Sequence, residues 1–159
     1  MTKHIKKVSG LSRREVLVGS AAGAGLVIGY SVLPNAVDSA SKAIAAGNWN
    51  HQQYLTMDSN GKAIVHVTKC ELGQHIGTAL AQAVAEELEI NWDDVSVDYP
   101  DSHAKWGLML TGGSWSVNWT FDRNSRIGAS ARIALIEAGS KMMKAMPANC
   151  YAKNSRVYT

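Results

Sequence analysis

Cysteine and proline are both scarce in this sequence. Only two cysteines, Cys70 and Cys150, occur among 159 residues, which excludes a disulfide-dense scaffold and a zinc or iron–sulfur site built from cysteine alone. One disulfide between these two residues stays open. The three prolines, the lack of low-complexity segments and a content of 46% hydrophobic and 18% charged residues predict a folded chain rather than a disordered one. The length suits about one domain.

A strong charge of one sign is also missing from the body of the chain. The whole sequence has a formal net charge of +3, but residues 46–159 contain ten basic and eleven acidic residues, a net charge of −1. The excess of basic residues therefore belongs to the first 45 residues. A body without a basic excess predicts no binding to nucleic acid.

The N-terminal residues 1–45 look like an export signal. The segment Ser12-Arg13-Arg14-Glu15-Val16-Leu17 resembles the twin-arginine motif, in which Arg13 and Arg14 would be the paired arginines. Residues 16–37 carry no charge and are only mildly hydrophobic, which is usual for this route and weak for a membrane span. We expect a signal helix outside the folded domain, which sends an already folded protein to the periplasm. The alternative is an uncleaved membrane anchor with a basic cytoplasmic flank.

After a polar linker at 46–52, residues 53–159 predict a domain with both strands and helices. Asn60-Gly61 is a strong turn signal between two segments of alternating hydrophobicity. Apolar residues at helical spacing follow in two later segments, and small residues such as Gly128 on one stripe of the second predict a close packing contact. The order of elements indicates an α+β fold. The expected elements are a β-hairpin of about 52–58 and 62–69, a helix of about 77–89, a strand of about 95–99 and a long helix of about 114–145.

Two glycine-bearing turns, each before a predicted helix, are the candidate ligand-binding sites. The first is Gly73-Gln74-His75-Ile76-Gly77-Thr78, where backbone N–H groups and a helix N-terminus favour an anion such as phosphate or pyrophosphate. The second is Thr111-Gly112-Gly113-Ser114-Trp115-Ser116, where three hydroxyls surround two glycines. Either turn alone is well explained as an ordinary helix start, capped in the second case by a hydroxyl. The pair is a stronger indication, because two such turns can converge on one polar ligand.

Other chemistry in the same region has weaker support. Ser114 half matches the elbow that carries a serine nucleophile, with His66, His75 or His103 as the base, but Ser116 replaces the second glycine of that motif. The spacing of the histidines matches no common metal site. These histidines are therefore expected to be solvated or hydrogen-bonded.

Two ordered segments resemble a known family. Lys69-Cys70-Glu71-Leu72-Gly73-Gln74 with Thr78-Ala79-Leu80 and Val84-Ala85-Glu86-Glu87-Leu88 forms the first, and Met109–Val117 forms the second. In this order they are similar to signatures of molybdopterin-binding subunits of the xanthine dehydrogenase and aldehyde oxidase family. After a twin-arginine signal, the isoquinoline 1-oxidoreductase beta-subunit branch matches best. The resemblance covers about residues 11–150.

The resemblance implies a molybdenum–molybdopterin cofactor, in its dinucleotide form, held by the two turns. It implies hydroxylation of an aldehyde or an N-heterocycle with oxygen from water, with electrons passing to iron–sulfur clusters on a small partner subunit and to an acceptor such as a cytochrome c. His75 and Trp115 depart from the family pattern, which has glycine and a small residue there. The residues expected to contact the cofactor are Gly73, Gln74, His75, Thr111, Gly112, Gly113, Ser114 and Ser116.

The length departs further from the family, whose catalytic subunits are several times longer. No segment matches the one that carries the family's active-site glutamate, so we expect neither a catalytic residue nor a direct metal ligand in this chain. The chain is expected to act with the remaining part of the molybdopterin-binding subunit and to be inactive alone. The alternative, favoured by His75, Trp115 and the short length, is a small exported interaction or structural protein that has lost the cofactor.

Overall fold

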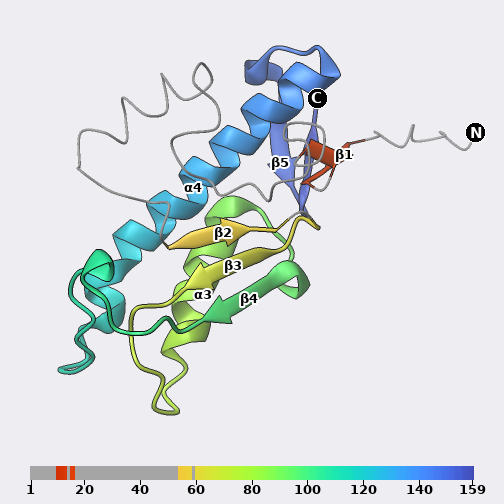
Figure 1. The fold of residues 1–159 in the computed structure, drawn as a ribbon. Helices are drawn as coiled ribbons and strands as arrows, with labels where there is room; N and C mark the ends of the chain where they lie inside the picture. Colours follow the sequence, from red (N-terminus) through yellow and green to blue (C-terminus); the bar gives the residue numbers. More distant parts are fainter. Residues whose placement is uncertain (1–9, 14, 17–53, 59) are drawn as a thin grey trace, which may run out of the picture.

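The structure of the chain, a computed structural model, describes residues 10–13, 15–16, 54–58 and 60–159 (Figure 1). The predicted linker at 46–52, Arg14 and most of the predicted signal lie outside the described residues. The expected α+β class is confirmed, with small shifts in the bounds of the elements. In chain order the elements are β1 (Leu11–Ser12), β2 (Leu55–Met57), β3 (Ala63–His66), α3 (Ile76–Leu88), η2 (Trp92–Asp94), β4 (Val95–Asp98), η3 (Ala104–Trp106), α4 (Ser116–Met143), η4 (Pro147–Asn149), β5 (Tyr151–Lys153) and β6 (Arg156–Tyr158).

The first sheet has the order β2-β3-β4. β2 and β3 form the predicted antiparallel hairpin, whose turn is held by Asp58: its Oδ1 accepts hydrogen bonds from the N–H groups of Asn60 (2.8 Å) and Lys62 (3.0 Å). β3 and β4 are parallel, and α3 is the crossover between them. A parallel pair needs such a crossover, so α3 is positioned by the sheet it connects.

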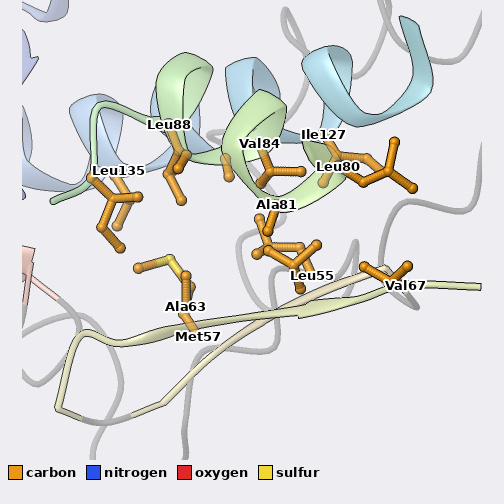
Figure 2. Packing of buried hydrophobic residues seen from close by; sticks show 14 of the residues in the cluster. Leu55, Met57, Ala63, Val67, Leu80, Ala81, Val84, Leu88, Ile127 and Leu135 are labelled. Atoms are coloured by element: carbon orange, nitrogen blue, oxygen red, sulfur yellow. The ribbon is translucent and has the colours of Figure 1, made fainter. Parts of the chain in front are cut away.

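Both long helices pack against one face of this sheet (Figure 2). Alternate residues of the strands are buried, as expected for a sheet with one covered face. The helices meet at Gly128 of α4, where an added Cβ would overlap the carbonyl oxygen of Val84 and lie 2.8 Å from Glu87 Cβ. This confirms the close approach predicted from the small residues. The main contributors to the core are Leu55, Met57, Val65, Leu80, Val84, Leu88, Ile127 and Leu135.

A second sheet, with the order β1-β6-β5, lies beside the C-terminal half of α4 (Figure 1). β5 and β6 form a hairpin that the sequence analysis did not predict. Asn154 and Ser155 both adopt the left-handed conformation, with φ of 47° and 59°, which is the geometry of a tight two-residue turn. Tyr151 and Tyr158 stack across the hairpin, with ring centroids 5.3 Å apart.

Part of the predicted export motif is integrated into the domain. Leu11 pairs with Val157, the N–H of Arg13 donates to the Ser155 carbonyl (3.2 Å), and Val16 is fully buried in the core. The described residues 10–13 and 15–16 therefore lie on the domain rather than outside it, because β6 offers Leu11–Ser12 a backbone partner and the core accepts Val16.

The side chain of Arg13 is only 2% exposed, although it carries a charge. Its Nη2 donates to the carbonyl of Leu88 at the end of α3, while Nε and Nη1 have no hydrogen-bond partner among the described residues. Desolvation lowers the pKa of Arg13 to about 10, against the opposing effect of the nearby carboxylates of Asp94 and Glu89. Arg13 thus provides a hydrogen bond to the last carbonyl of α3, and burying its positive charge costs folding free energy.

Candidate functional site

The two glycine-bearing turns lie at the same edge of the first sheet. β3 ends at His66 and β4 ends at Asp98, and the chain leaves both strands toward the following helices. Because β3 and β4 are parallel neighbours, their carboxyl ends share one edge. This edge is where open α/β sheets commonly bind ligands. The loop of residues 67–75 and the loop of residues 99–115 therefore start side by side.

Side chains then fasten one loop to the other. The N–H of Cys70 donates to Thr111 Oγ1 over 2.8 Å, and Lys69 Nζ donates to the carbonyl oxygens of Leu110 (2.8 Å) and Leu108 (3.5 Å). Lys69 is almost completely buried, and its pKa is lowered, first by desolvation and second by the charge of Arg123. The two loops are thus joined next to the turns, and the convergence of the turns on one ligand stays a prediction.

The first turn binds an anion that belongs to the protein itself. The Glu71 carboxylate accepts hydrogen bonds from the N–H groups of Gly73 (2.8 Å), His75 (2.9 Å) and Gly77 (3.3 Å). These are the N–H groups that we expected to face a phosphate. This role of Glu71 was not predicted, although an acidic residue just before a helix start is a known signal for such a contact. The carboxylate takes this place because it sits within reach of the N-terminus of α3.

Several contacts around Glu71 shift the pKa of its carboxyl group. Desolvation, the largest effect, raises the pKa of Glu71, but the hydrogen bonds from His75, Gly77, Gly73 and Tyr99 together bring it below its usual value. The Tyr99 hydroxyl donates to Oε2 over 3.4 Å, and desolvation followed by this carboxylate raises the pKa of Tyr99. An added Cβ at Gly77 would overlap the Tyr99 hydroxyl, so this glycine makes room for the contact.

Gln74 holds the shape of its own loop. Its Nε2 donates to the Cys70 carbonyl (2.9 Å), and its Oε1 accepts from the Leu72 N–H (2.6 Å). The residue is exposed, and one N–H of the amide is left for another partner. The amide therefore has both a structural function in the loop and one remaining donor for a ligand.

His75 is the N-cap residue of α3 and adopts the left-handed conformation, with φ of 59°. The usual glycine of the family would adopt this conformation without strain. Its side chain makes no capping hydrogen bond and is exposed beside Gln74. The imidazole is thus at the surface of the loop, where it can reach a ligand.

The second turn is open. Gly113 and Ser114 adopt left-handed conformations (φ of 61° and 57°), and α4 begins at Ser116. The N-cap residue is Trp115, and its side chain gives no capping hydrogen bond, so the expected hydroxyl caps are not what the structure shows. Residues 112–115 are exposed, and an added Cβ at Gly112 would have no atom within 4 Å. The N-terminus of α4 therefore keeps its positive end available, whereas Glu71 occupies that of α3.

The structure gives the serine-nucleophile hypothesis no support. His66 Nδ1 lies 2.7 Å from Asp98 Oδ2, and its Nε2 lies 2.9 Å from Thr56 Oγ1. His103 Nδ1 accepts from the N–H of Lys105 (3.0 Å). No hydrogen bond joins Ser114 to a histidine within the described part of the chain. The link from Thr56 through His66 to Asp98 joins the three strands of the first sheet, and the sequence gave no signal for it.

Neither metal nor disulfide chemistry is found in this region. Cys70 and Cys150 are both free, so the disulfide that the sequence left open is absent. The described ranges 10–13, 15–16, 54–58 and 60–159 contain no group of three or more His, Cys, Asp or Glu side chains that could hold a metal ion. The groups that the described residues present here are the remaining amide donor of Gln74 and the uncapped N-terminus of α4.

The chain is similar in sequence to one protein family and to two curated proteins. Residues 4–159 match the model of a family described as the molybdopterin cofactor-binding domain. The chain is 36% identical over 155 residues to a membrane-bound aldehyde dehydrogenase [pyrroloquinoline-quinone] of Gluconacetobacter polyoxogenes. The aligned region is 96% of this chain and 20% of that protein. The chain is also 30% identical over 138 residues to the isoquinoline 1-oxidoreductase subunit beta of Brevundimonas diminuta, covering 82% of this chain and 18% of that protein. The chain thus spans about a fifth of the length of these curated relatives.

Proposed function

The chain belongs to the molybdopterin cofactor-binding domain family, and from this premise we propose that it forms one part of the cofactor-binding surface of a molybdenum-dependent oxidoreductase. The observation that carries the proposal is the match over residues 4–159, combined with two glycine-bearing loops fastened at one sheet edge by the Cys70–Thr111 hydrogen bond. The alternative, an interaction protein without cofactor, gains some support from Glu71, which fills the first turn.

The second turn fits a phosphate or pyrophosphate group. It combines an uncapped helix N-terminus, an exposed Gly112-Gly113 backbone and the nearby hydroxyls of Thr111, Ser114 and Ser116. The first turn fits a different part of the cofactor. Because Glu71 already accepts from the N–H groups of that loop, Gln74 and His75 would contact a pterin through their side chains.

When bound, the cofactor would supply hydroxylation with oxygen from water and the transfer of electrons. The substrates proposed are aldehydes or N-heterocycles, by similarity to the two relatives. This chain would bind and orient the cofactor and shield one side of it from water. Since it spans a fifth of its relatives, the catalytic base would come from the remaining part of the subunit, and this chain alone would be inactive. The iron–sulfur clusters, and a cytochrome c acceptor, would belong to partner proteins.

Export through the twin-arginine route to the periplasm is part of the proposal, with Arg13 and Arg14 as the recognised pair. In the described residues, no helix combines the length and the apolar character needed to cross a membrane. One relative is named membrane-bound, so attachment through an uncleaved signal is the competing location. Replacing both arginines with lysine should leave the protein in the cytoplasm, as measured by cell fractionation and immunoblotting. Because Arg13 is buried in the domain, the melting temperature of the purified variant is the control that the fold is intact.

A pair of variants at Gly112 tests the cofactor site. Gly112→Asp places a carboxylate in the open turn, where an added Cβ has free space, so it should repel a phosphate without disturbing the fold. Gly112→Asn is the uncharged control of the same shape. In the assembled enzyme the aspartate variant should contain at least about fivefold less molybdenum than the asparagine variant, the ratio that corresponds to about 1 kcal/mol.

Metal analysis and chromatography of the released cofactor complete the test. About one molybdenum and one pterin per chain are expected by family membership. Pyrroloquinoline quinone in place of a pterin, or equal molybdenum in both Gly112 variants, would contradict the site. A complex that contains no molybdenum and no pterin would favour the interaction protein.

A further inference from the structure

The N-terminal end of α4 carries its apolar side chains on the outside. From Ile127 onward, the buried side of α4 is mainly apolar, as in an ordinary amphipathic helix. In the first three turns the buried side is polar instead, because it carries Thr120 and Asn124. The exposed large apolar side chains there, and in the loop just before them, are Leu108, Leu110, Trp115, Val117, Trp119 and Phe121, which we call the α4 tip.

The α4 tip is apolar on opposite sides of the helix. Successive residues of an α-helix are about 100° apart, so Val117 and Trp119 point about 200° apart around the axis. Phe121 lies close to Val117, and Trp115 lies close to Trp119, on their respective sides. The exposed polar residues Asn118 and Asp122 lie between these two apolar groups on the outer side of the helix, so a partner that covers both groups would also contact polar side chains. In Figure 1 this end of α4 projects past α3 and the first sheet, next to the loop that carries η3.

The tip is ordered by contacts of its own. The rings of Trp115 and Trp119 are tilted against each other with centroids 5.1 Å apart, and Lys69 Nζ lies 5.8 Å from the centroid of the Trp119 ring. The same ammonium group donates to the Leu110 carbonyl. Ordered tryptophans in an apolar cluster are the usual anchors of protein interfaces, because they bury much area at little entropic cost.

We propose that the α4 tip is the docking surface for the remaining part of the molybdopterin-binding subunit. This inference rests on the proposed function. The chain corresponds to only 20% and 18% of its two relatives, so in those proteins the rest of the polypeptide is available to surround the tip. A helix end that is apolar on opposite sides fits a groove in protein. A membrane or a flat dimer interface would cover only one side.

The position of the tip adds a consequence for the site. Leu110 precedes the second turn in the sequence, Trp115 lies within it next to Gly112-Gly113, and Trp119 follows one helical turn later. A polypeptide that covers these side chains therefore also covers the Gly112-Gly113 backbone. The docked partner would enclose the polar group bound there and exclude water from it, which strengthens the hydrogen bonds of the turn.

Oxidative footprinting by mass spectrometry tests the proposal. The probe is a chimera in which this chain replaces the aligned part of the Gluconacetobacter polyoxogenes relative, compared with the isolated chain. Trp92 is the internal control, because it is 46% exposed, as Trp119 is, and lies in η2, on a separate loop from the tip. Trp115, Trp119 and Phe121 should be oxidised about tenfold more slowly in the chimera, whereas Trp92 should not change.

Each other outcome overturns the proposal. Unchanged oxidation of the tip in a folded chimera would show that the rest of the subunit does not cover it. Protection in the isolated chain that increases with concentration would identify a second copy as the occupant, and protection by phosphatidylglycerol vesicles would identify a membrane. None of these measurements requires molybdenum, so they distinguish a misplaced surface from a misassigned cofactor.

A second measurement applies if the chimera does not fold. The triple variant Trp115→Ser/Trp119→Ser/Phe121→Ser of the isolated chain should melt within about 2 °C of the wild type, because uncovered side chains contribute little to stability. It should also bind several-fold less of a fluorescent hydrophobic dye. A large fall in melting temperature would show that the tip packs within this chain, which contradicts the proposal.

Discussion

The N–H of Cys70 and the hydroxyl of Thr111 are joined by a 2.8 Å hydrogen bond, although 41 positions separate the two residues in the sequence. This bond connects the loop after β3 to the loop after β4, the two loops that carry the glycine-bearing turns. Without this bond, the parallel pairing of β3 and β4 alone would leave the two loops free to separate. The polar contacts of Cys70 and Lys69 therefore determine the site as much as the sheet does.

Thr111→Val should loosen this site without unfolding the domain. The substitution keeps the shape of the side chain and removes the acceptor, and one neutral hydrogen bond contributes about 0.5–1.5 kcal/mol. The Cys70 amide proton should exchange with solvent several-fold faster, as measured by NMR, and molybdenum content of the assembled enzyme should fall. Thr111→Ser is the control and should behave like the wild type, since it keeps the hydroxyl. Slow exchange in the valine variant would show that the loops are held by other contacts.

Gln74→Ala should lower cofactor retention while leaving the fold intact. The alanine removes both contacts that shape the loop, to Cys70 and to Leu72, as well as the remaining amide donor. Loss of one hydrogen bond of about 1 kcal/mol corresponds to about a fivefold effect on molybdenum content or turnover. Circular dichroism should be unchanged. Full molybdenum content at an unchanged rate would show that this loop lies away from the cofactor.

The contacts of Glu71 predict a pH dependence of the first turn. Its pKa is lowered in the folded chain, so the unfolded or opened loop takes up a proton first as the pH falls. The stabilisation of the first turn by the Glu71 carboxylate is therefore complete above the usual pKa of a glutamate. It is lost as the pH falls through the lowered pKa. The amide protons of Gly73 and His75 should become less protected below pH 4.5 in the wild type. In Glu71→Gln they should be less protected already at pH 7, with little further change on acidification.

Gly128→Ala should destabilise the domain strongly. The added methyl group would collide with backbone and side chain of α3 at Val84 and Glu87, and overpacking of this kind costs about 1–3 kcal/mol. Gly139→Ala is a matched control on the same helix, because its nearest contact would be 3.1 Å from Val157 Cγ1. There the gain in helix propensity, up to about 1 kcal/mol, opposes the tight contact. Equal denaturation midpoints for both variants would contradict the close helix crossing.

Much of the fold follows from local patterns in the sequence. The Asn60-Gly61 turn, the period of the two helices and the glycine at position 128 predict the hairpin, α3, α4 and a close packing contact of α4, all of which the structure confirms; that the contact is with α3 was not specified by the sequence. These features depend on residues that are neighbours along the chain or on one helix face. The parallel β3–β4 pairing, which places the starts of the two loops side by side, was not predicted, and the binding of one ligand by both turns stays a prediction.

Other features depend on long-range contacts that no local pattern encodes. Glu71 takes the place expected for an external anion, and this depends on the geometry of the loop rather than on composition. The cross-strand link of His66 joins residues from three separate strands. Burial of Arg13 is the clearest case, since the charge and the motif both predict exposure, and only the distant β6 and the end of α3 account for its position.

The docking of β1 has a consequence for maturation. A protease that removed residues 1–45 would also remove Leu11 from its partner Val157, Val16 from the core, and the Arg13 donor from the Leu88 carbonyl. Cleavage after residue 45 would therefore alter the folded domain as well as remove the predicted export motif. The order in which proteolysis and assembly occur would then affect the stability of the domain, and another segment would have to fill the place that residues 11–16 had occupied.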